Sequence, residues 1–214
     1  MLRGLLISFE GVEACGKSTQ IRLLADRLGS AGFQVELVRE PGGTPLGEKL
    51  RHLLKYDPDG RGMAPETELL LMNASRSELV RRVIRPALAA GTIVLSDRFL
   101  DSTIAYQGAG RGLNDAVMTA VIGVAVGDTR PDLTVWLRVP PTEAAERLQS
   151  RSAGAEVSGD RFEEEHRTFF ERVERAYLSL ARAEPNRFVP VDGSGSPEEV
   201  AERIWSVVAP RVHR

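Results

Sequence analysis

The sequence predicts an α/β fold: a five-stranded parallel sheet with helices packed on both of its faces. Five short apolar segments alternate along the chain with segments of helical periodicity. Parallel strands need long crossover connections, which helices normally supply, and these helices then cover both sides of the sheet. The 214 residues contain neither an internal repeat nor a low-complexity linker, so we expect a single domain over residues 1–214.

The first half of the chain supplies three strands and four helices. Residues 5–9 (LLISF) form an apolar run between glycines, which predicts a buried strand. Apolar positions Ile21, Leu24 and Leu28 give residues 17–31 a helical spacing, and Gly32 ends it. The other elements expected here are strands at 34–38 and 92–97, helices at 44–54, 65–90 (kinked at Pro86) and 99–108, and a polar loop at 56–65.

The second half continues the alternation with two more strands. Residues 133–139 (LTVWLRV) and 188–191 (FVPV) are rich in apolar and β-branched side chains and predict the fourth and fifth strands. Residues 152–159 (SAGAEVSG) are small and flexible in composition, so we expect a mobile loop there. Helices are expected at 114–126, 141–150, 161–182 and 196–208.

Composition excludes several classes of protein. Basic and acidic residues nearly cancel, at 28 and 30, which predicts no binding of nucleic acid. Cys15 is the one cysteine, so an intramolecular disulfide is impossible and the chain fits a reducing, cytoplasmic compartment. No apolar run approaches the ~20 residues of a membrane span, and the N-terminus lacks a signal-peptide pattern. We therefore expect no membrane partner.

A phosphate-binding motif follows the first predicted strand and opens the first predicted helix. Gly11 to Ser18 matches G-x-x-x-x-G-K-[ST], in the strand–loop–helix context that this motif requires. Glycines let backbone N–H groups converge on an anion, Lys17 reaches the β- and γ-phosphates, and the Ser18 hydroxyl ligates Mg²⁺. The sequence thus predicts a P-loop NTPase-type fold that binds Mg²⁺ and a nucleoside triphosphate through Gly11, Val12, Glu13, Ala14, Cys15, Gly16, Lys17, Ser18 and Thr19.

Two carboxylates near this loop need separate explanations. Glu13 would repel a triphosphate, so we expect it to point away, toward an arginine or a hydroxyl of an acceptor substrate; an exposed loop charge is the alternative. Asp97 ends the third predicted strand, where an acidic residue typically holds Mg²⁺ or its water shell. Capping of the following helix is the alternative for Asp97.

Further motifs occur at the predicted carboxyl ends of the strands, where ligands bind in such sheets. Arg98 follows Asp97, and the turn Arg39 to Thr44 (REPGGT) contains two glycines and a proline. Such a turn is rigid and open to close approach by a substrate, although a purely structural turn is the alternative.

In combination, these motifs resemble those of the thymidylate kinases, in the P-loop nucleoside monophosphate kinase group. The resemblance covers nearly the whole chain, and REPGGT together with the later segments is far more restrictive than the P-loop alone. It rests on FEGVEACGKSTQ (9–20), REPGGT (39–44), EKLRHLL (48–54), SDR (96–98), STIAYQGAGRGL (102–113), RPDLTVWL (130–137) and DRFE (160–163).

The resemblance implies transfer of the γ-phosphoryl group of ATP to dTMP. It implies that Arg98 grips the dTMP phosphate with support from Arg39 and Arg51, that Arg76 binds the thymine, and that Tyr106 packs by the sugar and disfavours a 2′-hydroxyl. Ser102, Thr103 and Gln107 would line the pocket for the base and sugar. The family usually stacks a phenylalanine on the thymine, but Met72 stands at that position here. We expect Met72 to contact the base there without offering a flat π-face. The alternative is that Met72 belongs to the core and a nearby aromatic such as Phe99 compensates.

The resemblance also locates the arginine that stabilises the transferring phosphoryl group. Family members carry it either in the P-loop after the acidic residue or in a mobile lid. Ala14 follows Glu13, so we expect the lid arrangement, with a lid over 147–161. The expected catalytic residues are Lys17, Arg98 and a lid arginine, with Arg161 as first choice and Arg151 as second.

Two other functions compete with this reading. One is phosphorylation of another nucleotide or small metabolite on the same fold, which Met72 would favour by reshaping the base pocket. The other is a GTPase-like switch, but the N-K-x-D motif that reads guanine is absent because no lysine follows Lys55.

Residues 115–126 are unusually apolar for a surface helix. We expect these side chains to pack in the core. The resemblance also implies a homodimer.

Overall fold

The computed structural model describes residues 4–140, 142–144, 146–147, 161–162 and 165–212. In this part of the chain, five parallel strands form one sheet in the order β2-β3-β1-β4-β5. The strands are β1 (Leu6–Glu10), β2 (Val35–Arg39), β3 (Ile93–Asp97), β4 (Leu133–Arg138) and β5 (Phe188–Asp192). The predicted fold class is confirmed, and each strand lies within about one residue of its expected position.

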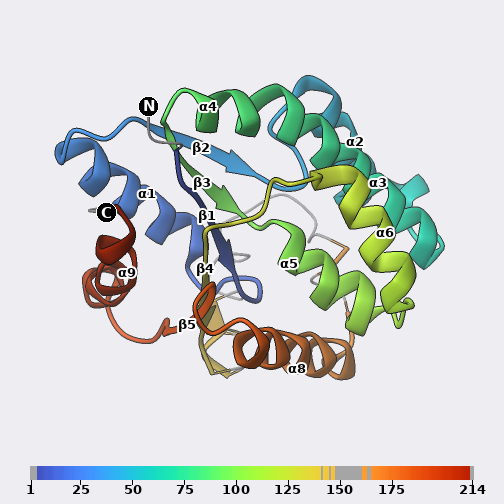
Figure 1. Ribbon diagram of the computed structural model, residues 1–214. Helices are drawn as coiled ribbons and strands as arrows, with labels where there is room; N and C mark the ends of the chain where they lie inside the picture. The colour runs from blue at the N-terminus through green and yellow to red at the C-terminus, as the bar shows by residue number, and fades with distance from the viewer. Residues whose placement is uncertain (1–3, 141, 145, 148–160, 163–164, 213–214) are drawn as a thin grey trace.

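Helices cover both faces of this sheet (Figure 1). On one face lie α1 (Lys17–Ser30) and α9 (Pro197–Val212), and on the other lie α3 (Pro65–Leu79), α5 (Leu100–Thr103), α6 (Asp115–Val126) and α8 (Arg167–Ala183). The remaining described helical segments are α2 (Pro45–Lys55), η1 (Pro58–Gly60), η2 (Val80–Ile84), α4 (Arg85–Ala89) and η3 (Ile104–Gly110).

Successive side chains of β1 point to opposite faces of the sheet and so pack in two separate hydrophobic cores. Ile7 and Phe9 pack with α1 and α9, whereas Leu6 packs with α3 and α6. Because side chains alternate along a strand, Ser8 and Glu10 share the face of Leu6. Glu10 is therefore buried beside α5 and α8 at the carboxyl end of the strand.

Three helix predictions differ from the structure. The helix expected at 65–90 continues to Ala89, but through a π-helical turn at η2, where the N–H of Arg85 bonds to the carbonyl of Val80, rather than a kink at Pro86. The helix expected at 99–108 is likewise a short α-helix followed by the π-helical η3. The prediction that a helix begins at Arg161 is wrong, because α8 begins at Arg167.

The expected lid, 147–161, lies outside the described residues apart from Arg147 and Arg161, and so does the expected mobile loop at 152–159. Of the helix expected at 141–150, residues 142–144 and 146–147 are helical. Within the described part of the chain, no helix is long and apolar enough to cross a membrane.

Candidate active site

The loop from Gly11 to Ser18 has the backbone that an anion cradle requires. Gly11 has φ 139°, and a Cβ there would lie 2.5 Å from the carbonyl oxygen of Leu137, so only glycine fits. Gly16 has φ 99° and directly precedes α1, so the helix N-terminus faces the loop. The Nζ of Lys17 donates to the carbonyl oxygens of Gly11 (3.1 Å) and Val12 (2.9 Å), which holds the ammonium over the loop.

Ser18 and Asp97 meet at the edge of this loop. The Oγ of Ser18 donates to Oδ2 of Asp97 over 2.9 Å, although 79 residues separate them. A hydroxyl and a carboxylate oxygen are the donors that Mg²⁺ prefers. Among the described residues no group of three His, Cys, Asp or Glu side chains could hold a metal by itself, so a cation here would need further oxygen ligands.

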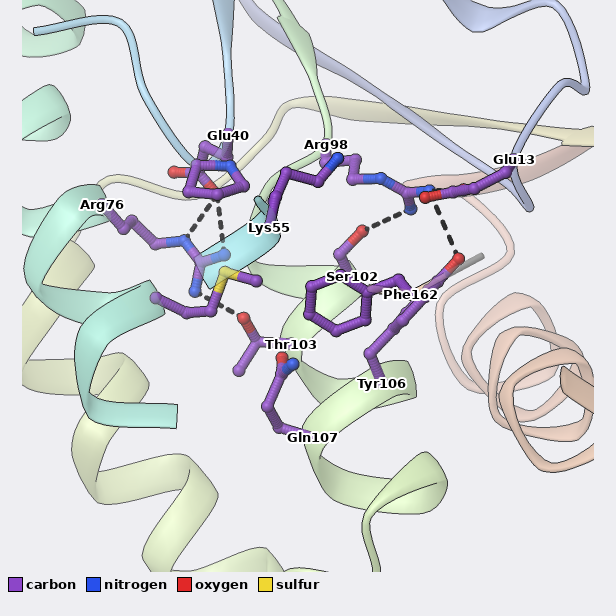
Figure 2. A pocket seen from close by; sticks show the side chains of 12 residues that line it. Glu13, Glu40, Lys55, Arg76, Arg98, Ser102, Thr103, Tyr106, Gln107 and Phe162 are labelled. Carbon is purple, nitrogen blue, oxygen red and sulfur yellow. Dashed lines mark hydrogen bonds and ion pairs between the residues drawn. The ribbon is translucent and has the colours of Figure 1, made fainter. Parts of the chain in front are cut away.

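Next to the loop, a pocket opens at the carboxyl ends of β2 and β3 (Figure 2). It contains about 420 Å³ of space between its walls, part of which is open to solvent. The described residues that line it are Glu13, Glu40, Pro41, Lys55, Met72, Arg76, Arg98, Ser102, Thr103, Tyr106, Gln107 and Phe162.

Arg98 occupies the end of the pocket nearest the phosphate-binding loop. Its guanidinium pairs with the carboxylate of Glu13, donates to Ser102 Oγ (3.1 Å) and Tyr106 Oη (3.2 Å), and lies 4.9 Å from the Tyr106 ring centroid. Glu13 therefore meets an arginine, one of the two partners expected for it. The backbone of Arg98 is left-handed, with φ 70°, which turns the side chain back toward the loop.

Arg76 forms the opposite end of the pocket and is almost fully buried. Its N–H groups reach Glu40 Oε2 (2.6 and 2.8 Å), Asn73 Oδ1 (2.9 Å), Thr103 Oγ1 (2.7 Å) and the carbonyl of Phe99 (3.1 Å). Four of its N–H groups thus donate hydrogen bonds to protein acceptors, and Nη2 also forms an ion pair with Glu40. Burial raises the pKa of Glu40 while Arg76 opposes that rise.

The sequence places the chain in a known family. A family model for thymidylate kinase matches residues 9–204. The chain belongs to the thymidylate kinase family. It is 48% identical to a thymidylate kinase of Synechococcus sp. (strain JA-3-3Ab), covering 97% of both chains, and 45% identical to one of Geobacter sulfurreducens, covering 99% of both. It also resembles the crystal structure of thymidylate kinase from Ehrlichia chaffeensis, with a TM-score of 0.75, 30% identity and coverage of 97% and 99%.

Most of the substrate residues that family membership led us to expect come together. Eight of them line the pocket: Glu13, Met72, Arg76, Arg98, Ser102, Thr103, Tyr106 and Gln107. Arg39 and Arg51 are not among the residues that line it: Arg39 is half-exposed and pairs with Glu48, and Arg51 donates to the carbonyl of Pro41. Their role as support for the phosphate stays a prediction.

The arginines expected in the lid differ in their placement. Arg161 does not face the phosphate-binding loop; its Nη2 donates to Glu68 (2.7 Å) and its Nε to the carbonyl of Leu54 (3.0 Å). Arg147 instead lies near the loop, with Nη1 3.5 Å from the carbonyl of Cys15 and Nη2 3.1 Å from that of Gly193. Arg151 lies outside the described residues.

Several pocket residues were missed at the level of sequence. Glu40 and Pro41 belong to the REPGGT turn and could have been named from it. Phe162 belongs to the DRFE motif (160–163), where only Arg161 was singled out. Lys55, at the end of α2, belongs to none of these motifs. Phe99, suggested as a substitute for the missing aromatic, is fully buried and does not line the pocket.

Glu10 lies behind Arg98 and was also missed. Its carboxylate accepts from the Phe99 and Ser102 N–H groups (2.9 and 3.2 Å), from Ser102 Oγ (2.5 Å) and from Tyr177 Oη (2.8 Å). Burial raises the pKa of Glu10 to about 7; Arg98, 3.9 Å away, opposes this rise, and Asp101 adds to it. Glu10 thus titrates near neutral pH beside the arginine at the head of the pocket.

We predict that Glu10 makes folding stability depend on pH. Between its usual pKa of 4.5 and about 7, the folded protein binds more protons than the unfolded chain, so the free energy of unfolding falls as pH rises through this window. From about pH 5 to about pH 8, the Tm of the wild type should fall a few degrees further than that of Glu10→Gln. Scanning calorimetry of both proteins measures this; a Tm difference that stays constant with pH contradicts it.

Proposed function

We propose that the pocket binds dTMP and that the adjacent loop binds ATP. As a thymidylate kinase, the protein phosphorylates dTMP to dTDP with the γ-phosphoryl group of ATP. The observation that carries the assignment of the sites is the position of Arg98. Its guanidinium stands at the junction of the pocket and the loop, where the phosphate of a nucleotide in the pocket would meet a donor phosphate on the loop.

Charge, rather than proton transfer, decides the chemistry at this junction. The acceptor is a phosphate monoester, which is largely dianionic at neutral pH and needs no strong general base. The obstacle is the approach of two polyanions, and aligned cations in a site from which water is excluded overcome it. Lys17 holds the β- and γ-phosphates of the donor, and Arg98 holds the phosphate of the acceptor.

Mg²⁺ fits the oxygen donors at the edge of the loop. Ser18 and Asp97, already 2.9 Å apart, would hold the ion together with ATP and water. When bound, Mg²⁺ neutralises charge on the β- and γ-phosphates.

The base is selected by hydrogen-bond polarity at the far end of the pocket. Nε2 of Gln107 donates to Oε1 of Glu68 over 2.7 Å, and because a carboxylate only accepts, the amide nitrogen must face Glu68. The amide oxygen is then left to accept the N3–H of thymine, whereas N3 of cytosine carries no hydrogen. Thr103 and Arg76 contact the base from the same end, and Tyr106 packs against the sugar.

Substrate specificity tests this assignment directly. With Mg²⁺ and ATP, purified protein should convert dTMP in preference to dUMP and leave dCMP, AMP and GMP essentially unconverted, as measured by coupled ADP formation. Preference for another monophosphate would instead support the alternative metabolite kinase.

Arg98→Met should lower kcat/KM for dTMP by about 100-fold or more, because it removes the cation on the acceptor phosphate. The exposed Arg82→Met is the control and should leave kcat/KM within about twofold.

A lid arginine completes the site. No arginine stands in the P-loop after Glu13. Arg161 is bound to Glu68, and Arg147 donates to the carbonyls of Cys15 and Gly193, so we propose Arg151 for the transferring phosphoryl group. The role predicted for Arg161 at that group stays a prediction.

Replacement of Arg151 should separate catalysis from binding. Arg151→Ala should lower kcat by about 10³-fold, the range of other catalytic arginines, with little change in the Kd of dTMP. Arg167→Ala, which removes an exposed arginine on α8, should leave kcat near normal. Steady-state kinetics showing normal turnover for Arg151→Ala would remove this residue from the mechanism.

A homodimer is proposed from the solvent face of α6. Val117 and Val124 are 47% and 79% exposed, and with Ala120 and Val121 they follow the i, i+3, i+4, i+7 spacing of one helical stripe. Leu70 on α3, which packs against α6, is 57% exposed as well. An exposed apolar stripe on a helix of this kind fits a second copy of the chain.

Light scattering tests the dimer. At micromolar concentration the wild type should have twice the mass of one chain, and Val117→Asp/Val124→Asp should have the mass of one. Leu46→Asp, at a 51% exposed leucine on α2, should leave the mass unchanged. A monomeric wild type would refute the proposal.

A cytoplasmic location, based on the single cysteine, stays a prediction, as do the absence of nucleic-acid binding and the organisation of residues 1–214 as one domain.

A further inference from the structure

We propose that Phe162 is the aromatic wall of the nucleoside pocket and that the buried carboxylate of Glu68 positions it by binding Arg161. This inference rests on the proposed function, in which the pocket binds dTMP. It assigns roles to three residues whose function in the site neither the sequence nor the comparisons establish.

The pocket needs a flat apolar surface, and Phe162 provides it. Met72 brings a flexible thioether and no π-face. Among the described residues that line the pocket, only Tyr106 and Phe162 are aromatic, and the Tyr106 ring lies under the guanidinium of Arg98 at the phosphate end. The Phe162 ring meets Tyr106 edge-on, with centroids 6.1 Å apart and planes at 75°, and Figure 2 shows it among the pocket residues. Phe162 is therefore the ring placed to pack against a base.

The segment that carries Phe162 is held from outside the pocket by Arg161. The backbone N–H of Arg161 bonds to the carbonyl of Lys55 (3.2 Å), and its Nε bonds to that of Leu54 (3.0 Å), at the end of α2. Its guanidinium also lies 4.7 Å from the centroid of the Phe162 ring, as a cation–π contact. These contacts replace the helix expected at Arg161 and turn the next side chain into the pocket.

Glu68 anchors this arrangement from α3. Its side chain is 1% exposed, and among the described residues its oxygens accept from Gln107 (2.7 Å), from Arg111 (3.0 and 3.2 Å) and from Arg161 (2.7 Å). Arg111 pairs in turn with Glu165 (2.5 Å), so two arginines balance two carboxylates. A buried ion of this kind is costly to leave unpaired, which favours one position for Arg161 and hence for Phe162.

The arrangement makes Arg161 a positioning residue that acts through the Phe162 ring. Replacing Arg161 should weaken dTMP binding and leave kcat nearly unchanged. An arginine at the transferring phosphoryl group would show the opposite pattern.

Replacing Phe162 tests whether its ring packs against the base. In calorimetric titrations of the purified full-length protein, Phe162→Leu should raise the Kd of dTMP about 10-fold, the scale of a base–aromatic contact. The KM of ATP should stay within about twofold. Phe170→Leu, on α8 and outside the pocket lining, should leave the Kd of dTMP unchanged. If Phe162→Leu does not melt cooperatively, Phe162→Met, which is closer in volume, takes its place.

A ligand without the base separates base contact from a general structural effect. The increase in Kd caused by Phe162→Leu should disappear for 2-deoxyribose 5-phosphate, because the ring then has nothing to pack against. An equal increase for both ligands, or an unchanged Kd for dTMP, overturns the assignment. Failure of the wild type to bind and phosphorylate dTMP would instead refute the proposed function itself.

Arg161 variants test whether Arg161 positions the ring of Phe162. Arg161→Met should raise the Kd of dTMP with kcat within about threefold, and Arg161→Lys should restore part of the affinity. The double variant Arg161→Met/Phe162→Leu should bind dTMP no more weakly than Phe162→Leu, because both changes remove the same contact. A loss of kcat of about 10³-fold with unchanged dTMP affinity would place Arg161 at the phosphoryl group and overturn its positioning role.

Discussion

The site depends on one largely buried cation, the guanidinium of Arg98. It is held at the carboxyl edge of the sheet by Glu13 from the phosphate-binding loop and by Ser102 and Tyr106 from the following helical segments. Glu10 lies behind it, and burial raises the pKa of Glu10 to about 7. The guanidinium is thus held in one position between the phosphate-binding loop and the pocket.

The same arrangement, a largely buried arginine paired with a carboxylate, occurs at two other places around the pocket. Arg76 pairs with Glu40 at the base end, and Arg161 pairs with Glu68 outside the ring of Phe162. Buried ion pairs of this kind add little net stability because desolvation offsets their attraction. Their effect here is geometric: each restricts a long side chain to one position and thereby shapes the surface that a nucleotide would meet.

Sequence reasoning succeeded where short-range pattern carries the information. The strands followed from apolar runs, the phosphate-binding loop from the spacing of Gly11, Gly16 and Lys17, and most residues that line the pocket from the family resemblance. It failed where long-range contacts override local preference. The segment at Arg161 has the composition of a helix, but its hydrogen bonds to Leu54, Lys55 and Glu68 keep α8 from beginning before Arg167.

By itself, the sequence determined the fold class, the family and the P-loop motif, because strands, P-loops and strand-end turns are encoded by neighbouring residues. Only the tertiary structure decided which ring lines the pocket and what each arginine faces. Glu68 and Arg161 are 93 residues apart, and Glu10 and Arg98 are 88 residues apart along the chain. No local pattern specifies such partners; burial, which makes an unpaired charge costly, selects them once the chain has folded.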